Sequence, residues 1–378
     1  IADAQASTYE LKNIQKTNVG GYSVVANYSF GSITSAVATL KITPFNSMYC
    51  FGDSWTDTGG NGCTWPSPDY YKNRACNGPM WPEFLSTNLG LTQVNTRNYA
   101  VCGSTSADIY NQVASRLFAP SKPELYLYAL GNPGADFLRF YPPNGLNGVY
   151  VDLTNQVAST RLIDTAVLNF SNAVQRLYQK GARSITYWHQ TGTNGSDIVA
   201  LGSARAGLLD GYTRSYNAKI TAAMEAFGRS RPDVRLYPIN LYVLWNDIST
   251  NPTSFGFTET TANALGDPRL RDKSFSGPGA DYLWWDRSHA TSKFHGFIAT
   301  SMFEELTNSV LEQLEATPAN ATHQIQMNHL LIGRDYTLQG SPNLNHWQDL
   351  QTFTASAGTN QWMGAPNNAA TIFYRLKW

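Results

Sequence analysis

The chain has 378 residues, which is enough for one large domain with additional modules. Its 27 Lys and Arg residues balance 27 Asp and Glu residues, so no basic excess points to nucleic acid or to an anionic membrane surface. No run of 18 apolar residues occurs, so no segment is predicted to span a membrane.

The composition favours a protein that works outside the cell. Only 14% of residues are charged while 13% are aromatic, a balance commoner in secreted or cell-surface bacterial proteins. The chain begins at Ile1 without a Met or a signal peptide, and we expect it to be a processed or trimmed form.

The first segment, residues 1–43, is predicted to be β-rich. Residues 22–35 contain two short β-prone runs with turn residues between them, and residues 36–42 alternate like another strand. This pattern resembles the last strands of a bacterial immunoglobulin-like module. Half a sandwich cannot bury its own face, so either the front half has been removed or these strands pack on a neighbouring domain.

The next stretch is an apolar run that ends at Gly52, with Asp53 and Ser54 directly after it. This order predicts a buried strand, a sharp turn that glycine tolerates, and then a polar loop or a helix start. A serine in this place lies at the carboxyl end of a strand, where open α/β sheets hold their chemistry. Taken alone, the tripeptide is more often a simple turn than a catalytic site.

Strand and helix patterns then alternate along the chain, which predicts a mostly parallel sheet with helices on both faces. Apolar periodicity predicts helices near residues 81–85, 162–177, 204–227 and 292–311, and strands at 125–130, 184–188 and 235–239.

Near the end of this region stand Asp286 and His289, three residues apart, which predicts that they share one face of a helical turn. A carboxylate beside an imidazole fixes its tautomer and stabilises the imidazolium. A hydrolytic serine needs such a base. Asp53 and Asp57 are alternatives to Asp286 as the carboxylate that orients the imidazole.

These motifs resemble those of the SGNH, or GDSL-type, lipase/esterase family. Asn98 to Gly103 match its Asn-Tyr/Phe-Ala-x-x-Gly stretch, and Gly131-Asn132 begins a loosened form of its Gly-x-Asn-Asp stretch, with Asp136 displaced. The resemblance implies an α/β fold, a three-layer αβα sandwich of flavodoxin-like type with a mostly parallel sheet, over residues 44–316. Small all-β additions are expected at both ends.

The resemblance also implies roles for individual residues. Ser54 is the expected nucleophile, His289 the base and Asp286 the group that orients it. The oxyanion is expected to bind the N–H groups of Ser54 and Gly103 and the side chain of Asn132. No metal or cofactor is implied, and no cysteine or histidine spacing predicts a zinc site.

Aromatic residues flank the motifs and predict an acyl or sugar groove. We expect Trp55, Trp81, His189 and Trp285 to line it; Trp65, Tyr70, Tyr71 and Trp284 belong to the same aromatic set. His295 is expected on a helix surface.

The four cysteines give a separate prediction. A disulfide between Cys63 and Cys76 would close the loop after the nucleophile, and the sequence leaves this pairing open. Cys50 and Cys102 are expected to be buried thiols.

The last segment, residues 317–378, resembles a small C-terminal β module of secreted bacterial proteins. Together these features predict a secreted serine esterase or lipase that acts on a small-molecule or polymer ester. Two alternatives stay open: a carbohydrate acetyl esterase whose β modules contact a glycan or the cell surface, and a non-catalytic secreted binding protein with a decayed hydrolase core.

Overall fold

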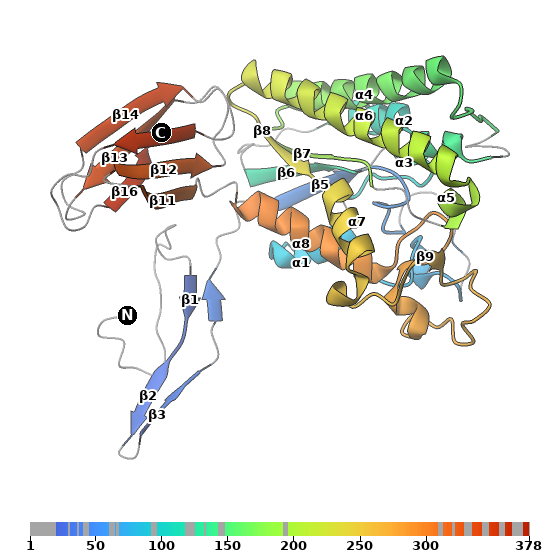
Figure 1. Cartoon of the computed structure of the whole chain (residues 1–378), viewed down its shortest axis with the longest axis horizontal. Helices are drawn as coiled ribbons and strands as arrows, with labels where there is room; N and C mark the ends of the chain where they lie inside the picture. The colour runs from blue at the N-terminus through green and yellow to red at the C-terminus, as the bar shows by residue number, and fades with distance from the viewer. Residues whose placement is uncertain are drawn as a thin grey trace. The chain divides into compact units, whose positions relative to one another are not determined.

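The computed structural model describes residues 20–28, 31–35, 38–40, 45–59, 65, 68–91, 97–117, 125–131, 134–142, 148–191, 196–308, 313–319, 322–328, 335–341, 348–354, 360–364 and 373–377. The chain divides into two compact units, Ile1–Pro44 and Phe45–Trp378 (Figure 1). The second unit holds the predicted motifs.

Four parallel strands form the central sheet in the order β5-β6-β7-β8, with bounds Ser47–Phe51, Tyr126–Leu130, Ser184–Trp188 and Arg235–Ile239 (Figure 1). Strand β7 is buried at every position, as expected for a parallel strand covered on both faces. A parallel bridge between Cys50 and Asn98 adds a further segment to the side of β5 away from β6.

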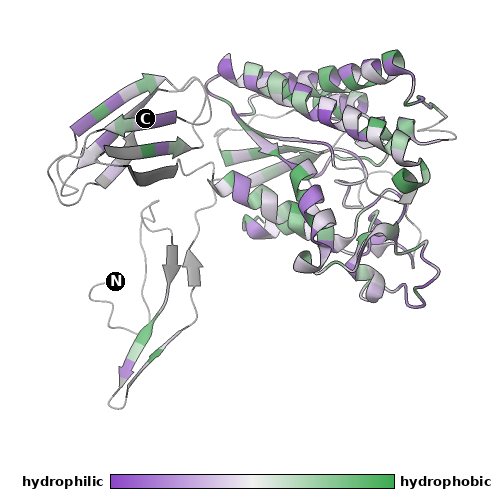
Figure 2. Cartoon of the chain, in the orientation of Figure 1, coloured by the Kyte–Doolittle hydropathy of each residue, from purple (hydrophilic) through white to green (hydrophobic). Residues whose placement is uncertain are grey.

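Three helices cover one face of this sheet: α2 (Ser106–Ala114), α4 (Gln156–Gln179) and α6 (Ser203–Arg229) (Figure 1). The buried side of α4 repeats every three to four residues, which confirms the predicted amphipathic helix. Figure 2 shows hydrophobic and hydrophilic residues alternating along α4 and α6. Their apolar sides form one core cluster with Tyr128 and Ile185 of the sheet.

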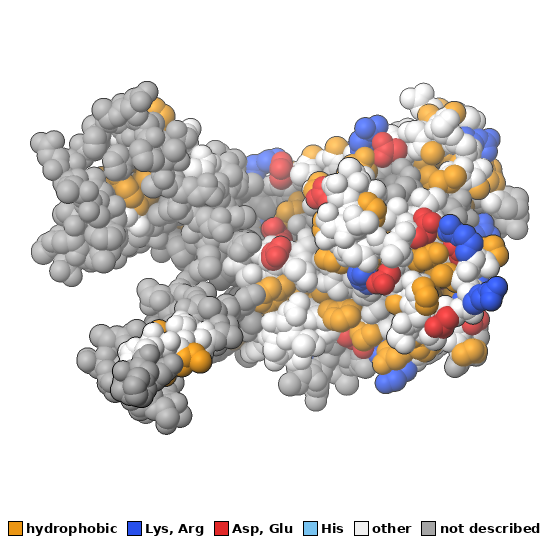
Figure 3. Space-filling model, turned by 60° about the horizontal axis from the view of Figure 1, so that its bottom comes forward, with side chains coloured by type: hydrophobic (Ala, Val, Ile, Leu, Met, Phe, Trp, Pro, Cys, Tyr) orange, Lys and Arg blue, Asp and Glu red, His pale blue; other side chains and the backbone are white. Residues whose placement is uncertain are grey.

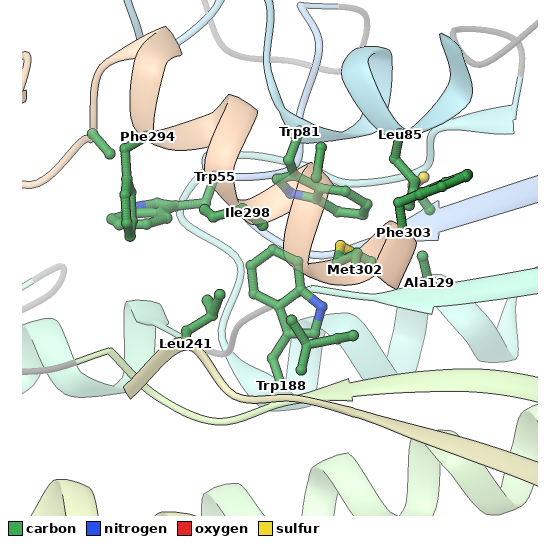
Figure 4. Packing of buried hydrophobic residues seen from close by; sticks show 14 of the residues in the cluster. Trp55, Trp81, Leu85, Ala129, Trp188, Leu241, Phe294, Ile298, Met302 and Phe303 are labelled. Atoms are coloured by element: carbon green, nitrogen blue, oxygen red, sulfur yellow. The ribbon is translucent and has the colours of Figure 1, made fainter. Parts of the chain in front are cut away.

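Three other helices cover the opposite face: α1 (Trp81–Asn88), α7 (Leu241–Thr250) and α8 (Ser292–Asn308). They form a second core cluster with the sheet, rich in aromatic side chains (Figure 4). The three-layer αβα fold is thus confirmed.

Short elements follow the carboxyl ends of the strands, where the site lies. They are η2 (Tyr71–Asn73), α3 (Gly134–Phe137), η5 (Leu138–Phe140), α5 (Ser196–Ala200), η6 (Pro252–Phe255), β9 (Glu259–Asn263), η7 (Pro278–Asp281) and β10 (Tyr282–Trp284). Strands β9 and β10 pair in parallel apart from the main sheet.

The described residues of the first unit form two antiparallel strand pairs. Strand β1 (Gly20–Tyr22) pairs with β4 (Ala38–Leu40), and β2 (Val25–Tyr28) pairs with β3 (Gly31–Thr34). All four residues of β3 are exposed. The immunoglobulin-like assignment of residues 1–43 stays a prediction.

The C-terminal β strands form two three-stranded antiparallel sheets, β11-β12-β15 and β14-β13-β16. Their bounds are Gln313–Ala319, Thr322–Asn328, Asp335–Ser341, Gln348–Thr354, Asn360–Gly364 and Phe373–Lys377 in chain order. A small core that includes Ile325 and Leu338 lies among them. The first strand begins four residues before the predicted boundary at 317.

The part of the chain that the structure describes has no helix that is both long and apolar enough to cross a bilayer. On the face drawn in Figure 3, basic and acidic side chains are interspersed, with hydrophobic side chains between them.

Candidate active site

The Gly52-Asp53-Ser54 turn lies where strand β5 ends, at Phe51. Gly52 has φ +155°, and a Cβ there would come within 2.6 Å of the Thr56 hydroxyl, so only glycine fits without a shift. The N–H groups of Thr56 and Asp57 donate to the carbonyl of Asp53 at 3.0 and 2.9 Å, which makes a single helical turn. This turn holds Ser54 half-buried at the end of the strand.

Asp53 supports the turn rather than reaching the base. Its Oδ1 accepts the N–H of Trp55 at 2.9 Å, and the residue is 3% exposed. Burial raises the pKa of Asp53 to about 7, although backbone donors and His289 favour the ionised form.

Asp286 and His289 lie in a tight turn after β10. The N–H of Trp285 donates to the carbonyl of His289 at 2.8 Å, and Trp284 forms an antiparallel bridge with Ala290. The predicted helical turn is therefore wrong: the chain folds back like a hairpin here, and α8 begins only at Ser292. The spacing of three still brings the two side chains together, because the hairpin reverses the chain within it.

The three predicted catalytic side chains form one continuous chain of hydrogen bonds. His289 Nε2 lies 2.8 Å from Ser54 Oγ, and its Nδ1 lies 2.8 and 2.9 Å from the two carboxylate oxygens of Asp286. A serine hydroxyl, an imidazole and a carboxylate in this order allow proton transfer from the hydroxyl.

Asp286 stays ionised in this environment. Burial disfavours its charge, but the charge and hydrogen bond of His289, the N–H of Ser288 and the hydroxyl of Tyr70 outweigh burial and lower its pKa. The carboxylate thereby remains an acceptor for the imidazole N–H.

Trp55 joins the nucleophile turn to the base. Its indole Nε1 donates to the carbonyl of Ser288 at 2.9 Å, next to His289. The ring packs edge-on against Phe294 and His295 at centroid distances of 6.2 and 5.8 Å. His295 is 1% exposed, so its predicted place on the helix surface is wrong; burial, followed by the nearby His289, lowers its pKa to about 3.

The predicted oxyanion donor Gly103 lies on the loop that runs beside β5. The N–H of Val101 donates to the carbonyl of Gly52 at 3.0 Å, so this loop follows the nucleophile turn. Gly103 has φ +73° and lines the same cavity as Ser54. Asn98 anchors the loop by donating to the carbonyl of Thr56 at 2.6 Å. Asn132 lies outside the described residues, so its role as a donor stays a prediction.

Gln112 of helix α2 binds both loops, a contact that the motifs did not indicate. Its Oε1 accepts the N–H of Gly52 at 3.0 Å, while its Nε2 donates to the carbonyl of Gly52 and to Ser104 Oγ, each at 2.9 Å. One side chain thus couples the nucleophile turn to the loop of Gly103.

A cavity of about 370 Å³ opens on Ser54 and His289. Its apolar wall comes from the segments after β6 and β7 and from β10, and it comprises Ala135, Phe137, Leu138, Tyr141, Ile198 and Trp284. Gln190, Thr191 and Arg287 add polar groups. This combination of an apolar wall and a few polar groups suits a small organic ligand.

Of the four residues predicted to line the groove, Trp55 does so. Trp81 and Trp285 are 0% exposed and lie in the core, Trp81 against Trp188 at 5.0 Å (Figure 4), and neither lines the cavity. His189 also does not line it: its Nε2 lies 2.8 Å from Thr221 Oγ1 of α6. Its neighbours Gln190 and Thr191, which follow the end of β7, reach the cavity instead.

The cysteines differ from the prediction. Cys76 is a buried free thiol that donates to the carbonyl of Gly78 at 3.1 Å, so the Cys63–Cys76 pairing is wrong. Cys50 is a free buried thiol as expected, whereas Cys102 is disulfide-bonded. Cys63 lies outside the described residues.

Comparison with known proteins agrees with this geometry. Residues 48–302 match the family described as GDSL-like Lipase/Acylhydrolase. The chain is 26% identical over 343 residues to the GDSL esterase/lipase APG of Arabidopsis thaliana, across 71% of this chain and 95% of that protein. It is 24% identical over 198 residues to another GDSL esterase/lipase of the same plant, across 49% of this chain and 54% of that protein, about half of its length.

Solved structures show a more distant likeness. An acetylxylan esterase from Geobacillus stearothermophilus is 15% identical with a TM-score of 0.40, over 71% of this chain and 96% of that one. A lipolytic protein of the G-D-S-L family from Veillonella parvula is 12% identical with a TM-score of 0.38, over 68% and 96% of the two chains.

Proposed function

Because this chain belongs to the GDSL-like lipase/acylhydrolase family of carboxylic ester hydrolases, we propose that it is a serine esterase that forms an acyl-enzyme on Ser54. The observation that carries the proposal is the hydrogen-bond chain from Ser54 through His289 to Asp286, which opens on an apolar-walled cavity.

The first half of the reaction acylates the enzyme. Ser54 Oγ attacks the ester carbonyl while His289 Nε2, at 2.8 Å, takes the hydroxyl proton. The carbonyl oxygen becomes an oxyanion, bound by the N–H groups of Ser54 and Gly103 and by Asn132. The intermediate then expels the alcohol, which takes the proton from His289, and the acyl group stays on Ser54.

The second half releases the acid. A water molecule gives a proton to His289 and attacks the acyl carbonyl through the same kind of oxyanion, and the proton returns to Ser54 as it leaves. Asp286 stabilises the imidazolium in both halves. One preorganised oxyanion donor typically lowers the barrier by about 2.7–4 kcal/mol, so the turn and the Gly103 loop need accurate placement.

We further propose that the substrate is an ester with an apolar acyl group and that the enzyme works outside the cell. The side chains of Phe137, Leu138 and Ile198 support the apolar acyl group because they offer an apolar wall in the cavity that also holds the nucleophile. The bonded state of Cys102 supports an oxidising compartment.

Trapping the acyl-enzyme tests the mechanism. Mass spectrometry after a brief reaction with p-nitrophenyl esters should find the acyl mass on the Ser54 peptide. Ser54→Ala should keep the fold by circular dichroism and fall below about a thousandth of wild-type turnover. Ser230→Ala, on the exposed end of α6, is the control and should leave turnover unchanged.

A substrate panel separates the two ester alternatives. We expect turnover on aliphatic esters from acetyl to palmitoyl to peak above acetyl. Higher turnover on acetylated xylan than on every aliphatic ester would instead assign the carbohydrate esterase. A wild-type enzyme without turnover on any of them would support the binding protein with a decayed core.

A further inference from the structure

Tyr70 touches the acid of the site from a different part of the chain. Its hydroxyl donates to Asp286 Oδ2 at 2.8 Å, across 216 residues of sequence. The other donors to this carboxylate, the N–H groups of Ser288 and His289 and the His289 ring, come from its own turn. Burial, followed by the charge of Asp286, raises the pKa of Tyr70 well above its usual value, so the phenol keeps its proton.

The backbone on either side of Tyr70 is fixed. The indole Nε1 of Trp285 donates to the carbonyl of Asp69 at 2.8 Å, and the N–H of Tyr71 donates to the carbonyl of Cys76 at 2.9 Å. Trp285, predicted to meet the substrate, therefore holds the segment that presents Tyr70. Because Trp285 also precedes Asp286, both partners of the hydrogen bond depend on one buried ring.

The loop after Tyr70 is held in an unfavourable conformation. Lys72 and Asn73 have φ values of 44° and 62°, in the left-handed region that costs most L-residues free energy. Arg74 locks this loop by donating to Glu83 of α1 through Nε and Nη2, at 2.8 and 2.7 Å. A strained loop that many contacts hold in place is typical of functional sites.

The aromatic ring of Trp65 completes this arrangement. It packs on Tyr70 at 4.9 Å and edge-on against His289 at 5.0 Å. The backbone N–H of Trp65 donates to Asn73 Oδ1 at 2.6 Å. The loop thus contacts both the acid and the base while the cavity side of His289 stays open to Ser54.

We propose that Tyr70 is a positioning residue of the reaction, which fixes the Asp286 carboxylate and sets the pH range in which His289 acts as the base. The inference rests on the proposed function. The phenol takes up part of the negative charge of Asp286, and less of that charge is then available to stabilise the protonated imidazole. Without the phenol, Asp286 attracts the imidazolium more strongly, so the variant is expected to need a higher pH to reach full activity.

Other charged and titratable groups surround His289 and stay unchanged in the test. Asp53 in the nucleophile turn and His295 of α8 interact electrostatically with His289, and Arg287 lines the same cavity. Cys76, in the loop of Tyr70, interacts electrostatically with Asp286. A change confined to the Tyr70 hydroxyl therefore isolates its contribution.

The test is the pH profile of kcat/KM for Tyr70→Phe, which removes one oxygen and keeps the ring. We expect the acidic limb to move upward by roughly half a unit to one unit. Tyr242→Phe is the matched control: its hydroxyl donates to Asp210 at 2.8 Å between α7 and α6, outside the cavity lining, and its acidic limb should match wild type.

A second comparison separates positioning from a purely structural role. In the background of Asp286→Asn, which removes the charge, adding Tyr70→Phe should no longer move the acidic limb. An unmoved limb in the Tyr70→Phe single variant, or an equal shift in both backgrounds, would overturn the inference. Failure of the proposed function itself would appear separately, as an active Ser54→Ala variant.

Discussion

The side chain of Gln112 forms hydrogen bonds with both backbone polar groups of Gly52. Its Oε1 accepts from the Gly52 N–H at 3.0 Å, and its Nε2 donates to the Gly52 carbonyl at 2.9 Å. The carboxamide imitates a strand partner at the point where β5 ends and the nucleophile turn begins. Its second N–H bond reaches Ser104, beside Gly103. One helix residue thus sets the distance between the nucleophile and an expected oxyanion donor.

Replacing Gln112 by Met should lower kcat by about 10- to 100-fold while KM changes little, because small misplacements of reacting groups are costly. Steady-state kinetics checks this, with Gln179→Met on the exposed side of α4 as the control. A variant whose kcat stays within twofold of wild type would show that the two loops hold their positions without the carboxamide.

Gly103→Ala should lower both stability and rate. A side chain at φ +73° costs roughly 1 kcal/mol, and relaxing that strain turns the N–H away from the oxyanion. Gly90→Ala is the matched control, because Gly90 has φ +67° and open space around the added Cβ, and it should lower stability without lowering kcat. Thermal unfolding and kcat, measured on both variants, separate the two effects. Equal kcat values for the two variants would contradict the oxyanion role of Gly103.

Asp53 predicts an unusual dependence of stability on pH. Its folded pKa is raised to about 7 from an ordinary value of 3.8, so between these values the folded state binds more protons than the unfolded state. This group therefore makes the free energy of unfolding fall as pH rises from about 4 to about 7. Urea unfolding should show that the free energy of unfolding falls less between pH 5 and pH 8 in Asp53→Asn than in wild type. An equal fall in both proteins would mean that a group other than Asp53 causes the pH dependence.

Asn132→Ala should lower kcat by roughly 10²- to 10³-fold with little change in KM, because an oxyanion donor acts on charge that develops in the transition state. Asp136→Ala is the comparison. Asp136 is 4% exposed and accepts the N–H of Ser106 at the start of α2 at 2.7 Å, so its loss should lower stability more than rate. A rate loss at Asp136 with none at Asn132 would mean that the motif is assigned to the wrong residues.

The sequence predicted the features that depend on local patterns. The strands at 184–188 and 235–239 and the helix through Leu162 and Phe170 follow from apolar periodicity. The contact of Asp286 with His289 follows from a spacing of three, although the turn that makes it is a hairpin.

Features that depend on distant packing were missed. Tyr70 meets Asp286 across 216 residues and Gln112 meets Gly52 across 60, and no local pattern encodes either contact. For the same reason the large rings of Trp81 and Trp285 could not be assigned to the core rather than to the groove.

The bond between Ser54 and His289 closes a loop of 235 residues, and the bond between Trp55 and the carbonyl of Ser288 closes one of nearly the same length. Closing such a loop has an entropic cost that is recovered only when the intervening strands and helices have packed. The nucleophile is synthesised 235 residues before its base. Catalytic competence therefore appears late in folding, and a chain that ends before His289 holds an inert serine.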